Sequence, residues 1–174
     1  MEKPLIKYSL VIPCYNESDN LPVLVDRCMI LLGKRADVEI LLVNNGSTDN
    51  THAMLKDLLN RLNKINLRIV HICKNQGYGF GIVLGLKECN GDIIGWTHAD
   101  LQTDPLDFIG AISIFENSNY SSDLFVKGNR INRPFKDVFF TRGMSLIEWA
   151  ILGTRMWDIN AQPTVFPKVF FTSL

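Results

Sequence analysis

Four short polar segments of this chain carry the side chains that could bind a ligand or do chemistry. They span residues 13–17, 44–49, 75–81 and 98–104 and are rich in Asn, Asp, Glu, His and Gly. Asparagine amides can read the edge of a nucleobase, because each carries two donors and an acceptor. Backbone amides of a Gly-rich loop that opens a helix suit phosphate oxygens. These residue types therefore indicate a site for a phosphorylated nucleoside.

The last of these segments holds the side chains best suited to a divalent metal ion. In an extended chain alternate residues point the same way, so we expect His98, Asp100 and Gln102 to converge. Their oxygen and imidazole groups can hold a divalent ion beside a diphosphate. The simpler interpretation is that Asp100 and Thr103 only cap the next helix. Turns and caps explain each polar segment separately, but four such segments at four strand ends favour a shared site.

An alternation of buried strands and amphipathic helices must position these segments. The expected strands are 8–13, 38–43, 67–72 and 92–97. The expected helices are 21–32, 82–89, 105–115 and one that follows capping residues at 47–49 and ends near Leu62. Residues 124–127 are a candidate fifth strand, and residues 165–171 are either a strand or an apolar lid. Such alternation indicates parallel strands with right-handed crossovers, which bind ligands at their carboxyl ends.

The bulk composition narrows the class of protein. The chain has 174 residues, 47% of them hydrophobic, and a formal net charge of +0. These values indicate one domain over residues 1–174 and no general affinity for nucleic acid. No apolar run approaches the ~18 residues of a membrane helix, and the first residues lack a signal-peptide core, so we expect a cytoplasmic protein. Cys14, Cys28, Cys73 and Cys89 form no C-x-x-C pair, and we expect reduced, buried thiols.

The order of the motifs resembles a known family. The segments at 12–17 (Ile-Pro-Cys-Tyr-Asn-Glu), 44–49 (Asn-Asn-Gly-Ser-Thr-Asp), 75–79 (Asn-Gln-Gly-Tyr-Gly) and 98–102 (His-Ala-Asp-Leu-Gln) follow one another as in family 2 glycosyltransferases. They are most similar to the polyprenyl- or dolichyl-phosphate sugar synthases. Each motif is weak by itself, and the ordered set, from about Tyr8 to about Phe171, is fairly specific.

This resemblance implies a GT-A fold, a Rossmann-like α/β fold with a mostly parallel central sheet flanked by helices. It implies inverting transfer of a sugar from a nucleoside-diphosphate sugar to a polyprenyl-phosphate or glycan acceptor, with Mn²⁺ or Mg²⁺. The nucleotide-sugar-binding part would be about 8–104 and the acceptor-side part about 105–174. Because the family's catalytic domain usually continues further, we expect this acceptor side to be incomplete. A lipid-phosphate acceptor would place the protein at the inner face of the membrane.

The resemblance also assigns roles to residues of this chain. Arg130 would lie near the phosphates, and Asp158 would be the catalytic base for an acceptor hydroxyl. The metal would be held by Asp100, Gln102 and His98. The nucleotide sugar would contact Pro13, Tyr15, Glu17, Asn44, Asn45, Gly77, Gly79, Ala99 and Asp100. A basic and apolar stretch at 130–140 could touch a membrane surface.

Two departures from the family pattern bear on these roles. Asn44 and Asn45 replace two aspartates, which removes negative charge where the base is read. His98 replaces the first aspartate of the D-x-D motif, which favours manganese over magnesium or leaves Asp100 to bind metal alone. The alternative function is therefore a catalytically inactive, glycosyltransferase-like module that binds a nucleotide. A nucleotidyltransferase is disfavoured, because those enzymes usually place a Gly-rich basic loop after the first strand.

Overall fold

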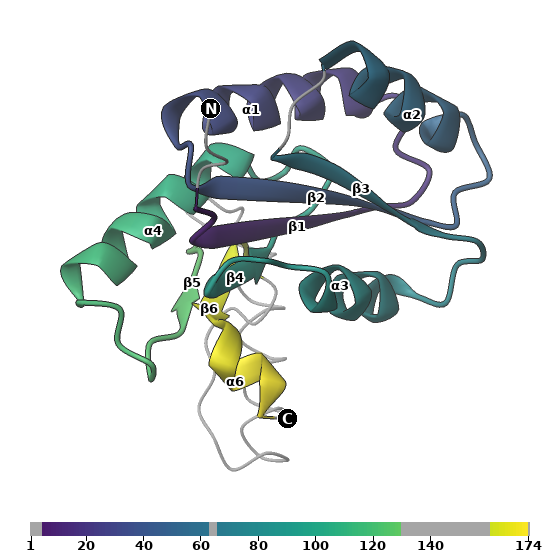
Figure 1. Ribbon diagram of the computed structural model, residues 1–174. Coiled ribbons are helices and arrows are strands. Elements are labelled where there is room, and N and C mark those ends of the chain that lie inside the picture. The colour runs from purple at the N-terminus through teal and green to yellow at the C-terminus, as the bar shows by residue number, and fades with distance from the viewer. Residues whose placement is uncertain (1–4, 63–65, 130–160, 174) are drawn as a thin grey trace, which may run out of the picture.

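The computed structural model describes residues 5–62, 66–129 and 161–173 and places six strands in one sheet (Figure 1). The strand order is β3-β2-β1-β4-β6-β5. The strands are β1 (Tyr8–Cys14), β2 (Val38–Asn45), β3 (Leu67–Ile72), β4 (Ile93–Trp96), β5 (Val126–Lys127) and β6 (Thr164–Pro167). The central strands β1 and β2 are buried along their whole length. They are nearly continuous apolar runs, as expected when helices cover both faces of a parallel sheet.

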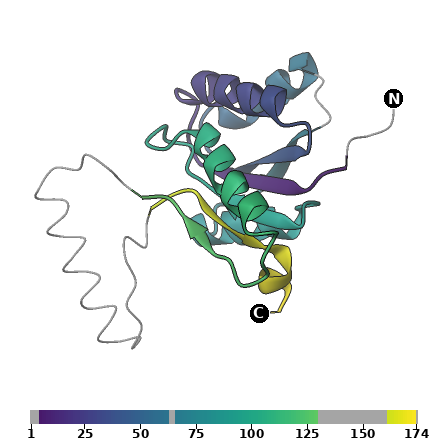
Figure 2. The ribbon, with the colours of Figure 1, turned by 90° about the vertical axis from the view of Figure 1, so that its left-hand side faces the viewer.

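Strands β1 to β4 pair in parallel, whereas β6, the last strand in the chain, is antiparallel to both of its neighbours. β1 pairs in parallel with both β2 and β4, and β2 pairs in parallel with β3. β6 runs antiparallel to β4, with Ile94 opposite Phe166, and also antiparallel to β5. Figure 2 shows β5, β6 and α6 (Lys168–Thr172) together at one side of the molecule. The expectation of a mostly parallel α/β sheet is therefore confirmed.

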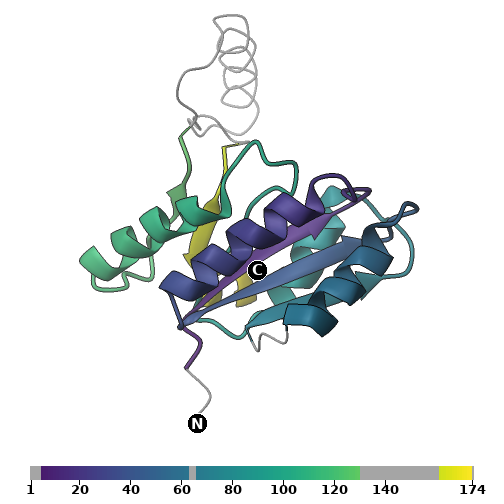
Figure 3. The same ribbon diagram turned by 90° about the horizontal axis from the view of Figure 1, so that it is seen from above.

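Helices cover both faces of the sheet and fix its two cores. On one face lie α1 (Leu21–Lys34), α2 (Thr51–Leu62) and, after the short helix η1 (Pro105–Asp107), α4 (Phe108–Asn117), side by side in Figure 3. The opposite face is covered by α3 (Tyr78–Lys87). Because strand side chains alternate between faces, Leu10 and Ile12 pack beneath α1 and α4, whereas Val11 packs against α3.

Close packing of α3 on the sheet depends on a glycine. A Cβ at Gly85 would lie 2.4 Å from Val11 Cγ1 and 2.8 Å from Val43 Cγ2. Any larger residue at this position would therefore push helix and sheet apart. This contact fixes the distance between α3 and the ends of β1 and β2, where the polar segments lie.

Most expected elements are confirmed; other bounds shift by one to a few residues, and three differences bear on the site or the fold. β2 continues through Asn44 and Asn45, which were expected in a turn, because both residues pair with β3 opposite His71 and Ile72. α3 begins at Tyr78, one turn earlier than expected, because packing against the sheet overrides the low helix propensity of its glycines. Residues 165–171 form the end of β6 and most of α6, so both a strand and a helix replace the expected strand or lid.

No helix within the described ranges is long and apolar enough to span a bilayer. All four cysteines are free thiols. Burial was correctly expected for three of them but was wrong for Cys73, which is exposed just after β3. Cys73 follows an edge strand of the sheet, which is covered less than the central strands.

Candidate functional site

A cavity of about 250 Å³ opens at the carboxyl ends of β1, β2 and β4. It is lined by Pro13, Cys14, Tyr15, Glu17, Asn45, Asn75, Gly77, Tyr78, His98, Ala99 and Asp100. All four polar segments of the sequence contribute to this lining. The structure therefore places them together at the edge where a parallel sheet binds its ligands.

Asn45 lines this cavity and carries a hydrogen-bond acceptor that no described residue uses. Its side chain is 2% exposed, and its Nδ2 donates to the carbonyl oxygen of Gly77 at 3.0 Å. That bond fixes the orientation of the amide. Among the described residues nothing donates to Asn45 Oδ1, which is buried. A buried acceptor without a partner is costly, so this oxygen is suited to an N–H of a ligand.

Asn44, one residue earlier on β2, lies on the other face of the sheet. Its Nδ2 lies 3.1 Å from Nδ1 of both His52 and His71, and its Oδ1 accepts the backbone N–H of Ser47 at 3.1 Å. The side chain is fully buried and does not line the cavity. Of the two asparagines expected to read a base, only Asn45 is therefore placed to do so.

The Gly-rich segment turns sharply into α3 at Gly77. This residue has φ +99°, a conformation that L side chains rarely adopt, and it lines the cavity. Asn75 holds the turn, because its Oδ1 accepts the Gly77 N–H at 2.7 Å. Gly79 lies inside the first turn of α3 and is not among the lining residues. Gly77, the N-cap of α3, and Tyr78, its first residue, both line the cavity, so the start of this helix lies at the cavity wall.

Tyr78 and His98 form a stacked pair in the wall of the cavity. Their rings lie 5.2 Å apart at 11°, and Tyr78 Oη lies 3.0 Å from His98 Nδ1. Burial, and to a lesser degree the charge of Asp100, raises the pKa of Tyr78 well above its usual range. The phenol therefore stays protonated. Tyr78 was missed by sequence reasoning, although its place between Gly77 and Gly79 at a helix start could have indicated it.

The expected extended arrangement of residues 98–102 is wrong. Leu101 has φ +61°, and Asp100 Oδ1 accepts the backbone N–H of Gln102 at 3.0 Å. Such a turn, in which an aspartate accepts from the backbone two residues on, breaks the alternation of side-chain directions. His98 and Asp100 line the cavity, but Gln102 does not. Across the described ranges no three His, Cys, Asp or Glu side chains cluster as a metal site, and a metal role for Gln102 stays a prediction.

The remaining expected residues divide into two groups. Pro13, Tyr15, Glu17 and Ala99 all line the cavity. Arg130 and Asp158, together with the 130–140 stretch, lie outside the described residues.

Cys14 is a further lining residue that the sequence did not single out. Burial raises the pKa of its thiol above the usual range, with smaller contributions from Cys28 and Glu17. Burial therefore favours the neutral thiol of Cys14 over the thiolate.

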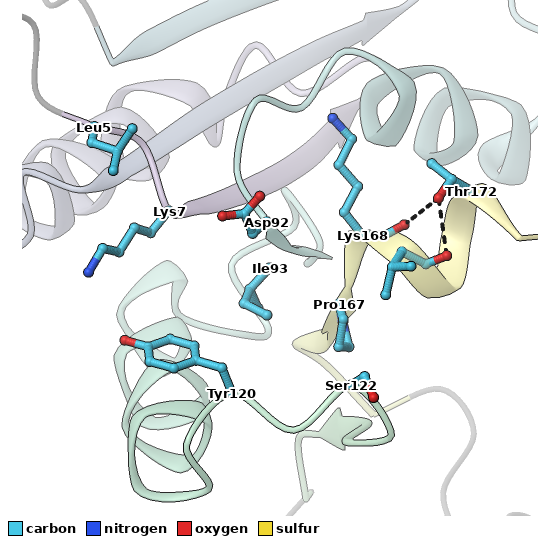
Figure 4. A pocket seen from close by; sticks show the side chains of 10 residues that line it. Leu5, Lys7, Asp92, Ile93, Tyr120, Ser122, Pro167, Lys168 and Thr172 are labelled. Atoms are coloured by element: carbon cyan, nitrogen blue, oxygen red, sulfur yellow. Dashed lines mark hydrogen bonds between the residues drawn. The ribbon is translucent and has the colours of Figure 1, made fainter.

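A larger cavity, of about 580 Å³, lies at the opposite ends of the strands, around the start of β4 and the end of β6 (Figure 4). Its lining includes Ile93, Pro167 and Val169 and none of the motif residues. The amino groups of Lys7 and Lys168 point in different directions in Figure 4, and that of Lys168 donates to the Cys89 carbonyl at 2.6 Å. These cations do not converge on one ligand, so the smaller cavity is the better candidate.

Comparisons with known proteins agree with this geometry. Residues 9–170 match the family described as Glycosyl transferase family 2. The chain is 33% identical over 142 residues to undecaprenyl-phosphate 4-deoxy-4-formamido-L-arabinose transferase of Yersinia pestis, covering 78% of this chain and 41% of the relative. The chain thus spans less than half of the curated relatives that it matches.

Solved structures show the same fold at low sequence identity. Mannosyltransferase PcManGT from Pyrobaculum calidifontis, in complex with GDP-Man and Mn²⁺, has a TM-score of 0.71 at 16% identity over 98% of this chain and 47% of that one. Glucosyl-3-phosphoglycerate synthase from Mycobacterium tuberculosis, with Mn²⁺ and UDP, has a TM-score of 0.70 at 19% identity over 97% and 59%. The chain belongs to glycosyl transferase family 2 and has the GT-A fold.

Proposed function

We propose that this domain binds a nucleoside-diphosphate sugar in the cavity at the ends of β1, β2 and β4. It transfers the sugar, with inversion, to a polyprenyl phosphate or a glycan. The name of the curated relative, an undecaprenyl-phosphate sugar transferase, supports the acceptor class. The complexes of the structural neighbours with UDP, UDP-GlcNAc or GDP-Man support the donor class. A lipid acceptor would place the domain at the cytoplasmic face of a membrane.

The observation that carries this proposal is the buried, unpartnered Oδ1 of Asn45, a residue that lines a cavity built from all four motif segments. A nucleobase offers N–H groups to such an acceptor, and Tyr15 at the rim is an exposed ring on which a base can stack. The diphosphate would then lie toward Gly77 and the start of α3, because the first N–H groups of a helix suit phosphate oxygens. The sugar would lie toward His98 and Asp100.

The residues at the sugar end of the cavity fit a divalent cation. Asp100 is an exposed carboxylate whose Oδ2 has no partner among the described residues. Magnesium sites commonly use one or two carboxylates together with substrate phosphates and water. Asp100 would hold Mn²⁺ or Mg²⁺, and His98 is the second candidate ligand. When bound, the ion would neutralise charge on the leaving diphosphate.

In the proposed reaction, the acceptor attacks the anomeric carbon from the face opposite the diphosphate. An acceptor phosphate is already ionised and needs little help from a base. An acceptor hydroxyl would need one, and Asp158 is the candidate. Arg130 would add positive charge near the phosphates.

Calorimetric titration with UDP, GDP and CDP tests the donor site, each with Mn²⁺, Mg²⁺ or a chelator. We expect one of the diphosphates to bind, and to bind more tightly with metal. Failure of all three to bind would contradict the proposal. Sugar transfer from the matching donor to a polyprenyl phosphate, followed by mass spectrometry, then tests the reaction. Binding without transfer to any acceptor would favour the inactive nucleotide-binding module.

A further inference from the structure

Hydrogen bonds join the loop after β1 to the loop after β2, and the side chains that make them have no role assigned by the family resemblance. Three consecutive backbone N–H groups after β1 donate to side chains of the second loop and of Thr51, the first residue of α2. These are Asn16 N to Ser47 Oγ at 3.1 Å, Glu17 N to Thr51 Oγ1 at 2.9 Å and Ser18 N to Asp49 Oδ2 at 3.2 Å. Side chains of residues 47–51 thus fix the backbone of residues 16–18.

The Asn16 side chain returns the contact from the other direction. Its Oδ1 accepts the backbone N–H of Thr48 at 2.8 Å and that of Asp49 at 3.4 Å. Its Nδ2 donates to Thr48 Oγ1 at 3.2 Å. One exposed side chain therefore bonds to the backbone of the second loop while its own backbone is held by that loop. Reciprocal bonds of this kind reinforce one another.

The backbone conformation at Asn16 explains why this residue type is present. Its φ is +56°, in the left-handed region, which Asn adopts far more readily than most residues other than Gly. The neighbours on each side, Tyr15 and Glu17, line the donor cavity, whereas Asn16 does not. The turn at Asn16 therefore directs its two neighbours into the cavity.

We propose that Asn16 is a positioning residue: it clasps the loops after β1 and β2 together and so holds Tyr15 and Glu17 in place before a ligand binds. Exposed loops are ordinarily mobile, and ordering them on binding would weaken affinity. Because the hydrogen bonds of Asn16 form without a ligand, the two loops are already ordered in the free protein. The inference rests on the proposed function only for the identity of the ligand.

Hydrogen–deuterium exchange in the free protein tests the clasp without any ligand. We expect the amides of residues 16–18, 48 and 49 to exchange slowly although they lie on exposed loops. In Asn16→Gly, which keeps the backbone conformation accessible but removes the side chain, the amides of 48 and 49 should exchange quickly. Rapid exchange of these amides in the unaltered protein would overturn the clasp.

Binding of a nucleoside diphosphate then tests the positioning role. Loss of the side-chain bonds should raise the Kd of Asn16→Gly by about tenfold, the equivalent of one or two hydrogen bonds. Asn119→Gly is the matched control, because Asn119 is also exposed, has φ +53° and lies after α4, away from the cavity. Asn119→Gly should leave Kd unchanged even if it lowers the melting temperature as much as Asn16→Gly does.

The outcomes separate the two proposals. If the unaltered protein binds no nucleoside diphosphate, the proposed function fails before any variant is made, and exchange still decides whether the clasp exists. If exchange accelerates in Asn16→Gly but Kd is the same as in the unaltered protein, the clasp is structural and the positioning role is overturned. Equal rises of Kd in Asn16→Gly and Asn119→Gly would overturn it as well.

Discussion

Asn44 and Asn45 are adjacent on β2, yet their amides serve different sides of the sheet. Asn45 donates to Gly77 O at 3.0 Å in the cavity, whereas Asn44 lies 3.1 Å from the Nδ1 atoms of His52 and His71 on the other face. The pleat of the strand produces this division, because successive side chains point to opposite faces. Loss of either amide should therefore have a different consequence.

Asn45→Ala should weaken binding of the nucleoside diphosphate. It removes the buried acceptor that the base would use, and one net hydrogen bond corresponds to a change in Kd of up to about tenfold. Calorimetry measures the change. Asn66→Ala is the control, since Asn66 Nδ2 also makes one bond to a backbone oxygen, that of Ala36. This bond lies at the amino ends of β2 and β3, away from the cavity. An Asn45→Ala protein with unaltered Kd would show that this oxygen does not meet the ligand.

Asp100→Ala should remove the dependence of nucleotide binding on metal. The Asp100 carboxylate is an oxygen ligand of the kind that divalent cations prefer, so the affinity measured with Mn²⁺ should fall at least about tenfold, toward the value measured with a chelator. Asp123→Ala, an exposed carboxylate in the loop before β5, should leave the metal effect intact. A metal effect that persists in Asp100→Ala would assign the ion to other residues.

Gly85→Ala should destabilise the fold by about 1–3 kcal/mol, the usual cost of overpacking a core. The added methyl group would lie 2.4 Å from a Val11 methyl carbon between α3 and the sheet. Chemical denaturation measures the loss. Gly33→Ala in the last turn of α1 is the control, since a Cβ there meets nothing within 4 Å. A neutral Gly85→Ala would mean that α3 can move away from the sheet without cost.

Asp49 should make the stability of the two joined loops depend on pH. Desolvation opposes its ionisation, but hydrogen bonds from Thr51 and Ser18 outweigh this effect and lower the pKa of Asp49 to about 2. A folded-state pKa below the unfolded value contributes stability at neutral pH that is lost as pH falls from about 4 to about 2. Urea unfolding of the unaltered protein and Asp49→Asn at pH 7, 5, 4 and 3 measures it. The free energies of unfolding of the two proteins should converge as the pH falls. A difference that grows on acidification would contradict this account.

The sequence by itself determined the alternation of strands and helices, their parallel pairing and the place of the site. Continuous apolar runs at β1 and β2 predicted buried strands, and the helices between them required parallel pairing. Parallel strands bring their carboxyl ends to one edge, so four polar segments far apart in the chain were correctly expected there. The motif residues Pro13, Tyr15 and Glu17 line the cavity for this reason.

Only the tertiary structure decided which side chains face the ligand. A strand buried on both faces has no apolar–polar alternation, so its sequence cannot tell which of Asn44 and Asn45 faces α3. The turn at Leu101 depends on the Asp100 hydrogen bond to Gln102, and the Tyr78–His98 stack joins residues 20 positions apart. Antiparallel β6 lies between β4 and β5 because long-range pairing, not local propensity, selects its neighbours. Local patterns set the elements of this protein, and contacts between distant segments set the geometry of its site.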